Sequence, residues 1–196
     1  MKIAKRLECN EQLENEMHSL QGGKGHINGQ NLGPVAKMRF GAVSAGFASC
    51  ELIAVYNVLN DLGIHRRLSS IFYDAEKAGY LLLKGVFGTR IGSIGKLLEK
   101  YGVKSKKIKA KEFIELAKNR RIRDGAIYII TIRNNRLLPI SPLHTFESVF
   151  ENGKWTVYNR FSNLNGTSVY TELDDILSNG RSRGAIYSVY EIMEKL

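Results

Sequence analysis

The chain has 196 residues, of which 43% are hydrophobic, and a formal net charge of +10 from 29 basic and 19 acidic side chains. This length suits one domain with its own core, and no apolar run approaches the ~20 residues that span a bilayer. The first residues lack the apolar stretch of a general secretory signal, so we expect no such signal. The positive charge favours anionic partners, such as nucleic acid, acidic lipid or cell-wall polymer.

A polar, helix-forming segment opens the chain and ends in Gly22 and Gly23. Glu16, Met17 and Leu20 precede the two glycines at a spacing that resembles the double-glycine leader of bacterial exported peptides. Met17 and Leu20 would share one helix face, and two glycines fit a narrow protease cleft because they lack a Cβ. This pattern predicts cleavage after Gly23. The alternative is an ordinary N-terminal helix that ends at Gly-Gly.

Helix patterns dominate the first two thirds of the chain, and strand patterns dominate the last third. We expect helices over 11–19, 49–62, 68–78, 91–101, 111–119 and 171–177. We expect strands over 126–132, 144–150 and 155–158, with the Asn152-Gly153 pair as a hairpin turn between the last two. The segment from 185 reads as a last strand to 190 or as the start of a helix. Helices followed by antiparallel strands indicate an α+β fold with a helical N-terminal lobe.

The densest basic cluster lies at 104–111 and is followed by a second one at 120–123. We interpret them as a solvated helix face and loop. No aromatic residue lies among the lysines, which argues against a nucleic-acid partner that stacks bases. Zinc-ligand spacings and phosphate-binding loops are also absent from the sequence, so it predicts no metal and no cofactor.

Cys50 lies where a small, flexible stretch turns into an amphipathic helix. A thiol at a helix start is close to unpaired backbone N–H groups and to the positive end of the helix dipole, which favours the reactive thiolate. Cys9 is the other cysteine, and two thiols do not make a disulfide framework. The alternative role for Cys50 is that of a small buried residue.

Two further residues follow Cys50 in a suggestive order. His144 opens one predicted strand, and Asn159 ends the next strand across the hairpin, so the two side chains are expected to lie side by side. This order and these contexts resemble papain-like cysteine peptidases, in particular the compact bacterial branch that includes the double-glycine (bacteriocin-processing) peptidases. The likeness covers roughly residues 40–190 and implies a papain-like fold, with the nucleophile at a helix start packed on the antiparallel sheet.

The resemblance also implies roles for these residues. Cys50 would attack a carbonyl carbon as thiolate, His144 would protonate the leaving amine, and Asn159 would orient the imidazole through its amide oxygen. Two positions depart from the family pattern. Ser44 occupies the position at which the family has a glutamine that stabilises the oxyanion. Glu51 follows the cysteine at a position where glycine is common in the family. The Glu51 carboxylate would disfavour a neighbouring thiolate.

We therefore expect residues 1–23 to be a leader and residues 24–196 to be a papain-like cysteine hydrolase domain that cleaves peptide bonds by a Cys–His–Asn mechanism. The protein would be synthesised in a bacterial cytoplasm and exported by a transporter with its own double-glycine peptidase. Its partners would be a peptide or protein substrate and an anionic cell-wall surface. Two alternatives stay open: a catalytically impaired binding protein, and a cell-wall amidase, acyltransferase or transglutaminase-like enzyme with the same three residues.

Overall fold

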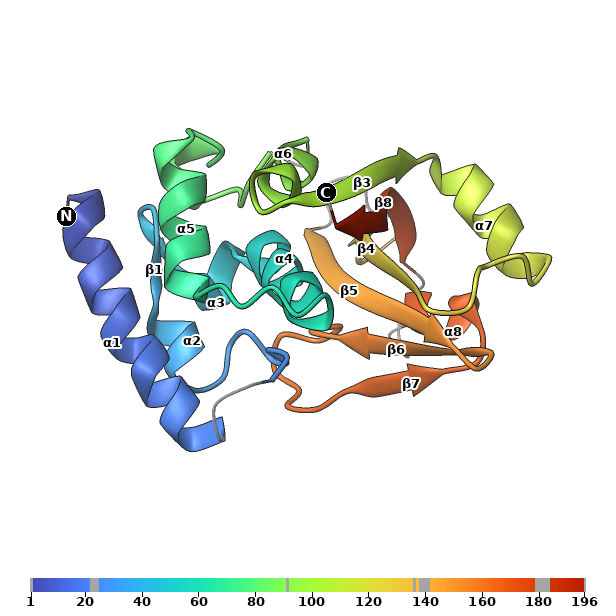
Figure 1. Cartoon of the computed structure of the whole chain (residues 1–196), viewed down its shortest axis with the longest axis horizontal. Helices are drawn as coiled ribbons and strands as arrows, with labels where there is room; N and C mark the ends of the chain where they lie inside the picture. The colour runs from blue at the N-terminus through green and yellow to red at the C-terminus, as the bar shows by residue number, and fades with distance from the viewer. Residues whose placement is uncertain are drawn as a thin grey trace.

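The computed structural model describes residues 2–21, 25–90, 92–135, 137, 142–178 and 184–195. Helices fill the N-terminal half, and a sheet built mainly from the C-terminal half lies beside them, so the fold is α+β as the order of elements predicts (Figure 1). None of the helices in these ranges has the length and apolarity to cross a bilayer.

The helices are α1 (Ile3–Gln21), α2 (Gly33–Lys37), α3 (Ala45–Ala48), α4 (Cys50–Asp61), α5 (Leu68–Lys77), the 3-10 turn η1 (Leu83–Gly85), α6 (Ser93–Lys100), α7 (Ala110–Lys118) and α8 (Leu173–Leu177). The strands are β1 (Arg39–Phe40), β2 (Val43–Ser44), β3 (Val103–Ile108), β4 (Ala126–Arg133), β5 (Leu143–Glu151), β6 (Lys154–Tyr158), β7 (Ser168–Tyr170) and β8 (Ala185–Lys195).

The main sheet has the strand order β3-β8-β4-β5-β6-β7, and every neighbouring pair is antiparallel. The turn between β5 and β6 confirms the hairpin prediction: Asn152 and Gly153 both have positive φ, at 53° and 73°, as a two-residue hairpin loop requires. A separate two-stranded hairpin, β1-β2, precedes α3.

Each face of the sheet supports its own hydrophobic core. Side chains alternate along β4, so that Ile129 joins the core under α4, α5 and α6, whereas Tyr128 and Ile130 join the core under α7 and α8. Trp155 and Phe113 complete an aromatic cluster with Tyr128 on this second face. The alternation decides on which side of the sheet each polar residue of β5 lies.

Helix α4 is the central element of the first core. It lies between α5 and the sheet (Figure 1) and contacts α5, α6, β4 and β5. All residues from Cys50 to Leu59 are buried. The sequence predicted one buried stripe, but a helix packed between other helices and a sheet buries its whole circumference. Its first residue, Cys50, is therefore enclosed by neighbouring elements.

Strands β3 and β8 differ from the sequence expectation. The segment 104–108 belongs to strand β3, although we interpreted it as helix or loop, and the chain from Ala185 to Lys195 is a strand throughout, so the helix alternative is wrong. Both differences have one cause, because β8 pairs with β3 on one side and β4 on the other. Long-range pairing of this kind overrides local propensity.

Helix α1 packs along α5 as part of the first core (Figure 1). Asn10, Glu14 and Met17 are buried on one face of α1, at helical spacing. The predicted cleavage residues Gly22 and Gly23 lie outside the described residues, and a division of the chain at residue 23 stays a prediction. The structure adds one fact: Met17, an apolar residue of the leader pattern, is 2% exposed within this chain's own core.

Candidate functional site

Cys50 begins α4 immediately after the short helix α3, with Ser49 between them. The cysteine is 7% exposed, and its thiol donates a hydrogen bond to Oε2 of Glu51 over 3.4 Å. Burial raises the pKa of the Cys50 thiol well above its ordinary value, and the Glu51 carboxylate raises it further, whereas hydrogen bonding from Thr145 lowers it. The protonated thiol is thus the resting form.

Glu51 is buried beside the thiol, on the first turn of α4. Burial raises its pKa to about 7, although the backbone N–H of Thr89 donates a hydrogen bond that opposes the shift. Gly88 lies so close that a Cβ at this position would approach Oε1 of Glu51 to 3.0 Å. The loop before α6 therefore encloses the carboxylate and leaves it aimed at the thiol.

His144 lies near the start of β5 and is 7% exposed. Its Nε2 is 2.6 Å from the backbone carbonyl oxygen of Asn159. A carbonyl only accepts, so Nε2 carries the proton and Nδ1 is left with a lone pair. Burial lowers the pKa of His144 to about 4, so the ring is neutral at pH 7.

Asn159 holds His144 through its backbone, because its side chain is used elsewhere. The Asn159 carboxamide pairs with Gln30: Oδ1 accepts from the Gln30 backbone N–H, and Nδ2 donates to Gln30 Oε1, both over 3.1 Å. The backbone N–H of Asn159 donates to Oδ1 of Asn28 over 2.8 Å. A φ of 58° turns the chain here, in a conformation that asparagine tolerates better than most residues.

Residues 144 and 145 point to opposite faces of β5. Thr145 faces α4, where it contacts Cys50 and where its hydroxyl bonds the Thr131 hydroxyl over 2.9 Å. His144 shares the other face with Phe146, at a ring separation of 6.3 Å. Among the described residues no hydrogen bond joins Cys50 to His144. The structure thus brings His144 and Asn159 together and brings Cys50 to the same end of β5, from the other side.

Ser44, the predicted oxyanion donor, ends β2 and precedes α3. It is half-buried, and its side chain does not cap that helix. Gln30 is a residue that the sequence did not single out. It is 3% exposed, and its Nε2 donates to the backbone carbonyl of Gly46, in α3, over 2.9 Å. Gln30 therefore connects Asn159 to the segment that leads into Cys50, and no fixed spacing from the cysteine could have revealed this connection.

One group of residues could hold a metal ion. His26, Asp61 and Glu147 each present a ligand atom, and these atoms all lie within 4.8 Å of one another. Asp61 follows His26 by 35 residues and Glu147 follows Asp61 by 86 residues, so no short sequence motif predicts this group. The group lies at the opposite end of α4 from Cys50, because Asp61 is the last residue of that helix.

Comparisons with known proteins give little at the level of sequence: no family model matches the chain, and no curated protein does so at a significant level. At the level of structure, the crystal structure of the Pseudomonas avirulence protein AvrPphB resembles it with a TM-score of 0.41 and 10% sequence identity. The match covers 74% of this chain and 91% of that chain. What the site does has to follow from its own residues.

Proposed function

We propose that the chain is a papain-like cysteine peptidase, of the double-glycine type, with Cys50 as its nucleophile. The observation that carries the proposal is the position of Cys50: a lone buried thiol at the first residue of the central helix, within contact of the strand that bears His144. His144, Asn159 and Gln30 supply a buried polar network next to it.

In the proposed reaction the Cys50 sulfur bonds to the carbonyl carbon of a peptide, the C–N bond breaks, and the leaving amine takes up a proton. Water then hydrolyses the thioester and restores the thiol. Glu51 lies within hydrogen-bond distance of the thiol, and its pKa of about 7 suits a group that accepts and returns a proton near neutral pH. His144 is the second proposed acid–base group, since Nδ1 keeps a lone pair. Ser44 stays a proposed oxyanion donor.

A test of this function compares Cys50→Ala with Cys9→Ala on peptide libraries, with product release measured by mass spectrometry. The Cys50 variant should lose turnover by more than about four orders of magnitude, because no other group forms the acyl intermediate. Cys9→Ala should keep wild-type turnover, since Cys9 lies on α1, outside the site. Hydrolysis that survives in Cys50→Ala would reject the nucleophile.

A second candidate is a papain-like protein that binds a peptide without turnover. The bond from the thiol to Glu51 and the placement of His144 on the far face of β5 favour it. In that case the wild-type chain binds peptide but releases no product, and Cys50→Ala binds equally well. A cell-wall amidase or acyltransferase would instead release products from cell wall in a Cys50-dependent manner.

Export through a double-glycine leader is proposed as well, with a peptidase-containing transporter as partner and an anionic cell wall as destination for a chain of net charge +10. The intact mass of the native protein tests this. A species that begins at Lys24 supports the leader, and a full-length species in every compartment rejects it.

A further inference from the structure

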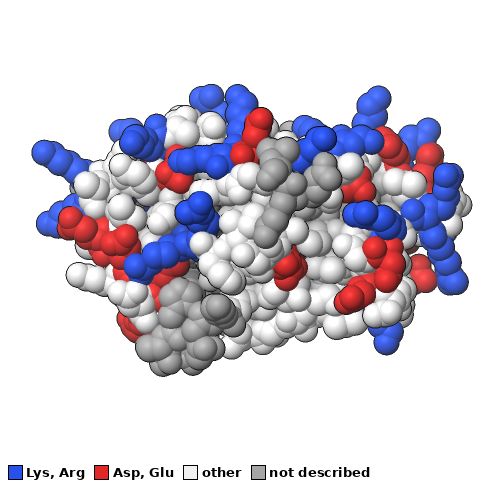
Figure 2. All heavy atoms as spheres, viewed as in Figure 1, with Lys and Arg blue, Asp and Glu red and all other residues white. Residues whose placement is uncertain are grey.

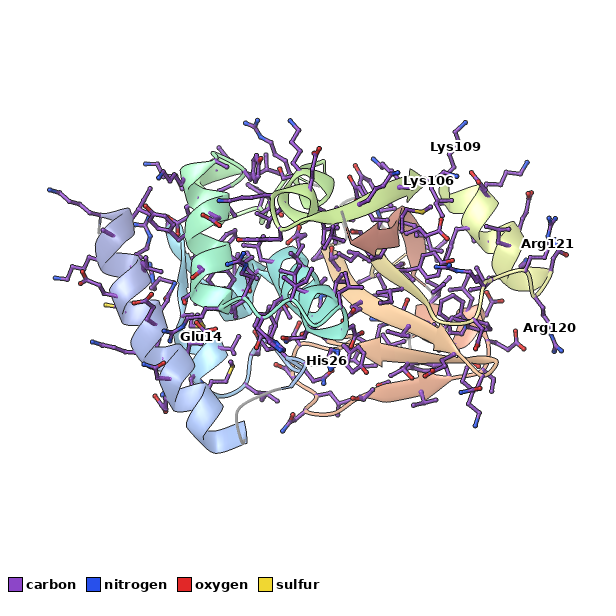
Figure 3. All side chains as sticks on the ribbon, in the orientation of Figure 1. Glu14, His26, Lys106, Lys109, Arg120 and Arg121 are labelled. Carbon is purple, nitrogen blue, oxygen red and sulfur yellow. The ribbon has the colours of Figure 1, made fainter. Side chains whose placement is uncertain are left out.

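The strongest feature outside the Cys50 site is the cluster of His26, Asp61 and Glu147. Three separate elements meet there: the segment that follows α1, the last turn of α4, and the middle of β5. Figure 3 labels His26, beside the end of α4 and the sheet. Nε2 of His26 lies 2.6 Å from Oδ1 of Asp61 and 4.0 Å from Oε2 of Glu147.

Glu147 makes this cluster unusual. Its side chain is fully buried, and neither carboxylate oxygen has a hydrogen-bond donor among the described residues. A buried carboxylate without donors is costly, and the nearby Asp61 carboxylate adds a like charge. Such a pair needs a shared proton or a cation between its oxygens.

We propose that His26, Asp61 and Glu147 bind a divalent first-row transition metal ion, with zinc as the expected ion. One imidazole nitrogen and two carboxylate oxygens form a ligand set that zinc accepts, and a fourth position is left for water. Magnesium and calcium prefer oxygen-only sites, so the imidazole disfavours them.

The spacing of the ligand atoms fits this ion after small shifts. A tetrahedral zinc site has bonds of about 2.0–2.1 Å, so its ligand atoms lie about 3.3 Å apart. The two distances from Nε2 of His26, 2.6 Å and 4.0 Å, lie on either side of that value. Asp61 and His26 are about one fifth exposed, which leaves them room to move and an entry path for the ion.

Further contacts fix the position of the histidine. The His26 ring stacks on Tyr158 with centroids 3.7 Å apart and planes 8° from parallel. The next residue, Ile27, exchanges two hydrogen bonds with the side chain of Asn57 on α4: its N–H donates over 2.8 Å and its carbonyl accepts over 3.1 Å. The ring orientation is thus set before any ion arrives, as in preorganised metal sites.

A bound ion would fasten the segment 25–31 to α4 and β5. The same segment holds Asn159 through Asn28 and Gln30, so the proposed ion supports the polar network beside Cys50 from a distance. Twelve helical residues separate the two ends of α4, which corresponds to about 18 Å. The ion would therefore act on the fold and on the position of Asn159, outside direct contact with the thiol.

The test uses the full chain after treatment with chelator, with Co²⁺ as the spectroscopic probe and Zn²⁺ for calorimetry. We expect one ion per chain, the visible absorption of tetrahedral Co²⁺ without a thiolate charge-transfer band, and a rise in Tm with Zn²⁺ but not with Mg²⁺. His26→Ala and Glu147→Gln should each weaken Zn²⁺ affinity at least about 100-fold, since each removes a ligand. His65→Ala, which removes an exposed histidine, should bind as the wild type does.

Four results would overturn the proposal: no binding or Tm rise at roughly a hundredfold molar excess of Zn²⁺, a thiolate band, a rise in Tm with Mg²⁺ alone, or unchanged affinity in His26→Ala. The first would mean that the cluster holds no cation and that Glu147 is neutral through a proton of its own, in line with the raised pKa that burial gives it. If Glu147→Gln does not fold, His26→Ala decides, because that side chain is partly exposed and its removal leaves the buried strand intact.

Discussion

The imidazole of His144 is bound by the backbone carbonyl of Asn159, with Nε2 and the oxygen 2.6 Å apart. The amide oxygen, which the family resemblance assigns to this task, accepts the backbone N–H of Gln30 instead. Any amino acid at position 159 would provide this backbone carbonyl. The asparagine side chain therefore contributes in two other ways: it tolerates the positive φ, and it pairs with Gln30.

This relationship predicts different effects for two substitutions at Asn159. Asn159→Gly keeps the carbonyl and adopts the positive φ without strain, whereas Asn159→Ala has to place a Cβ in the left-handed region. We expect the alanine variant to be about 1 kcal/mol less stable than the glycine variant in urea unfolding. The His144 pKa measured by NMR should stay low in the glycine variant. An alanine variant that equals or exceeds the glycine variant in stability would contradict this account.

Glu51 predicts a loss of stability as pH rises. Its pKa is raised from 4.5 to about 7 in the folded state, so the folded chain binds the proton more tightly than the unfolded chain does. The resulting stabilisation is complete below pH 4.5 and is lost as pH rises to about 7, by about 3 kcal/mol. Glu51→Gln should not show this loss. Free energies of unfolding measured from pH 4 to pH 8 in both chains check the prediction.

His144 gives the free energy of unfolding a pH dependence opposite to that of Glu51, so the two contributions can be compared directly. Its pKa falls from 6.5 to about 4 on folding, so its contribution is complete above pH 6.5 and is lost as pH falls to about 4. The two effects oppose each other in the wild type between pH 4.5 and 6.5, and Glu51→Gln should expose the acid-side loss. Parallel pH curves for wild type and Glu51→Gln would show that Glu51 titrates as an ordinary carboxyl group.

Removal of the Glu51 charge should make Cys50 more reactive. The carboxylate raises the thiol pKa both by its charge and as hydrogen-bond acceptor, so Glu51→Gln should increase the thiolate fraction at neutral pH. We expect faster alkylation of Cys50 by iodoacetamide in the variant, with the rate at Cys9 as internal control. If Glu51 also accepts the thiol proton during turnover, the same variant loses hydrolysis while it gains alkylation. An unchanged alkylation rate would show that burial alone holds the thiol protonated.

Glu14 on α1 should contribute strongly to stability because it caps α5. Its carboxylate accepts the backbone N–H groups of Leu68 over 2.6 Å and Ser69 over 3.2 Å, together with the Ser69 hydroxyl and the Arg67 guanidinium. Figure 3 labels Glu14 between the two helices. Glu14→Ala should lower the free energy of unfolding by about 2–4 kcal/mol, since it leaves buried donors unpaired.

The control for Glu14 is Glu8→Ala, which removes the same charge from an exposed position on the same helix. Chemical denaturation of both variants separates capping from net charge. Equal stability of the two variants would mean that the Glu14 cap adds nothing to the packing of α1 on α5.

Local patterns in the sequence predicted the hairpin at Asn152-Gly153, helix α4 and the α+β order, because each depends on residues close together in the chain. The path of β8 between β3 and β4 depends on pairing between residues at least 52 positions apart, which no local pattern encodes. In the candidate site, the sequence predicted the helix start at Cys50 and the proximity of His144 to Asn159, and both features are present in the structure. The sequence could not show that Thr145, and not His144, is on the face of β5 that packs against Cys50. A shift of the strand register by one residue would reverse the two faces.

The electrostatics of Cys50 show a second limit of the sequence. The helix start predicts a lowered thiol pKa, but burial and the adjacent carboxylate outweigh the dipole, and the pKa is raised. Both effects depend on enclosure by Thr145 and by the loop at Gly88, which come from distant parts of the chain. The pairing of Gln30 with Asn159 could not be predicted from the sequence either, because only the fold brings the two residues together.

The lysines of β3 have a consequence for how copies of this chain meet. Strand β3 is an outer strand of the sheet, with β8 as its one neighbour in the strand order of the described residues, and Lys104, Lys106 and Lys107 are exposed on it. Basic side chains extend along this border and around α7 in Figures 2 and 3. A second copy that added its own β3 would bring the lysines together, and their repulsion blocks edge-to-edge aggregation. This protection weakens at high ionic strength, where screening shortens the reach of the repulsion.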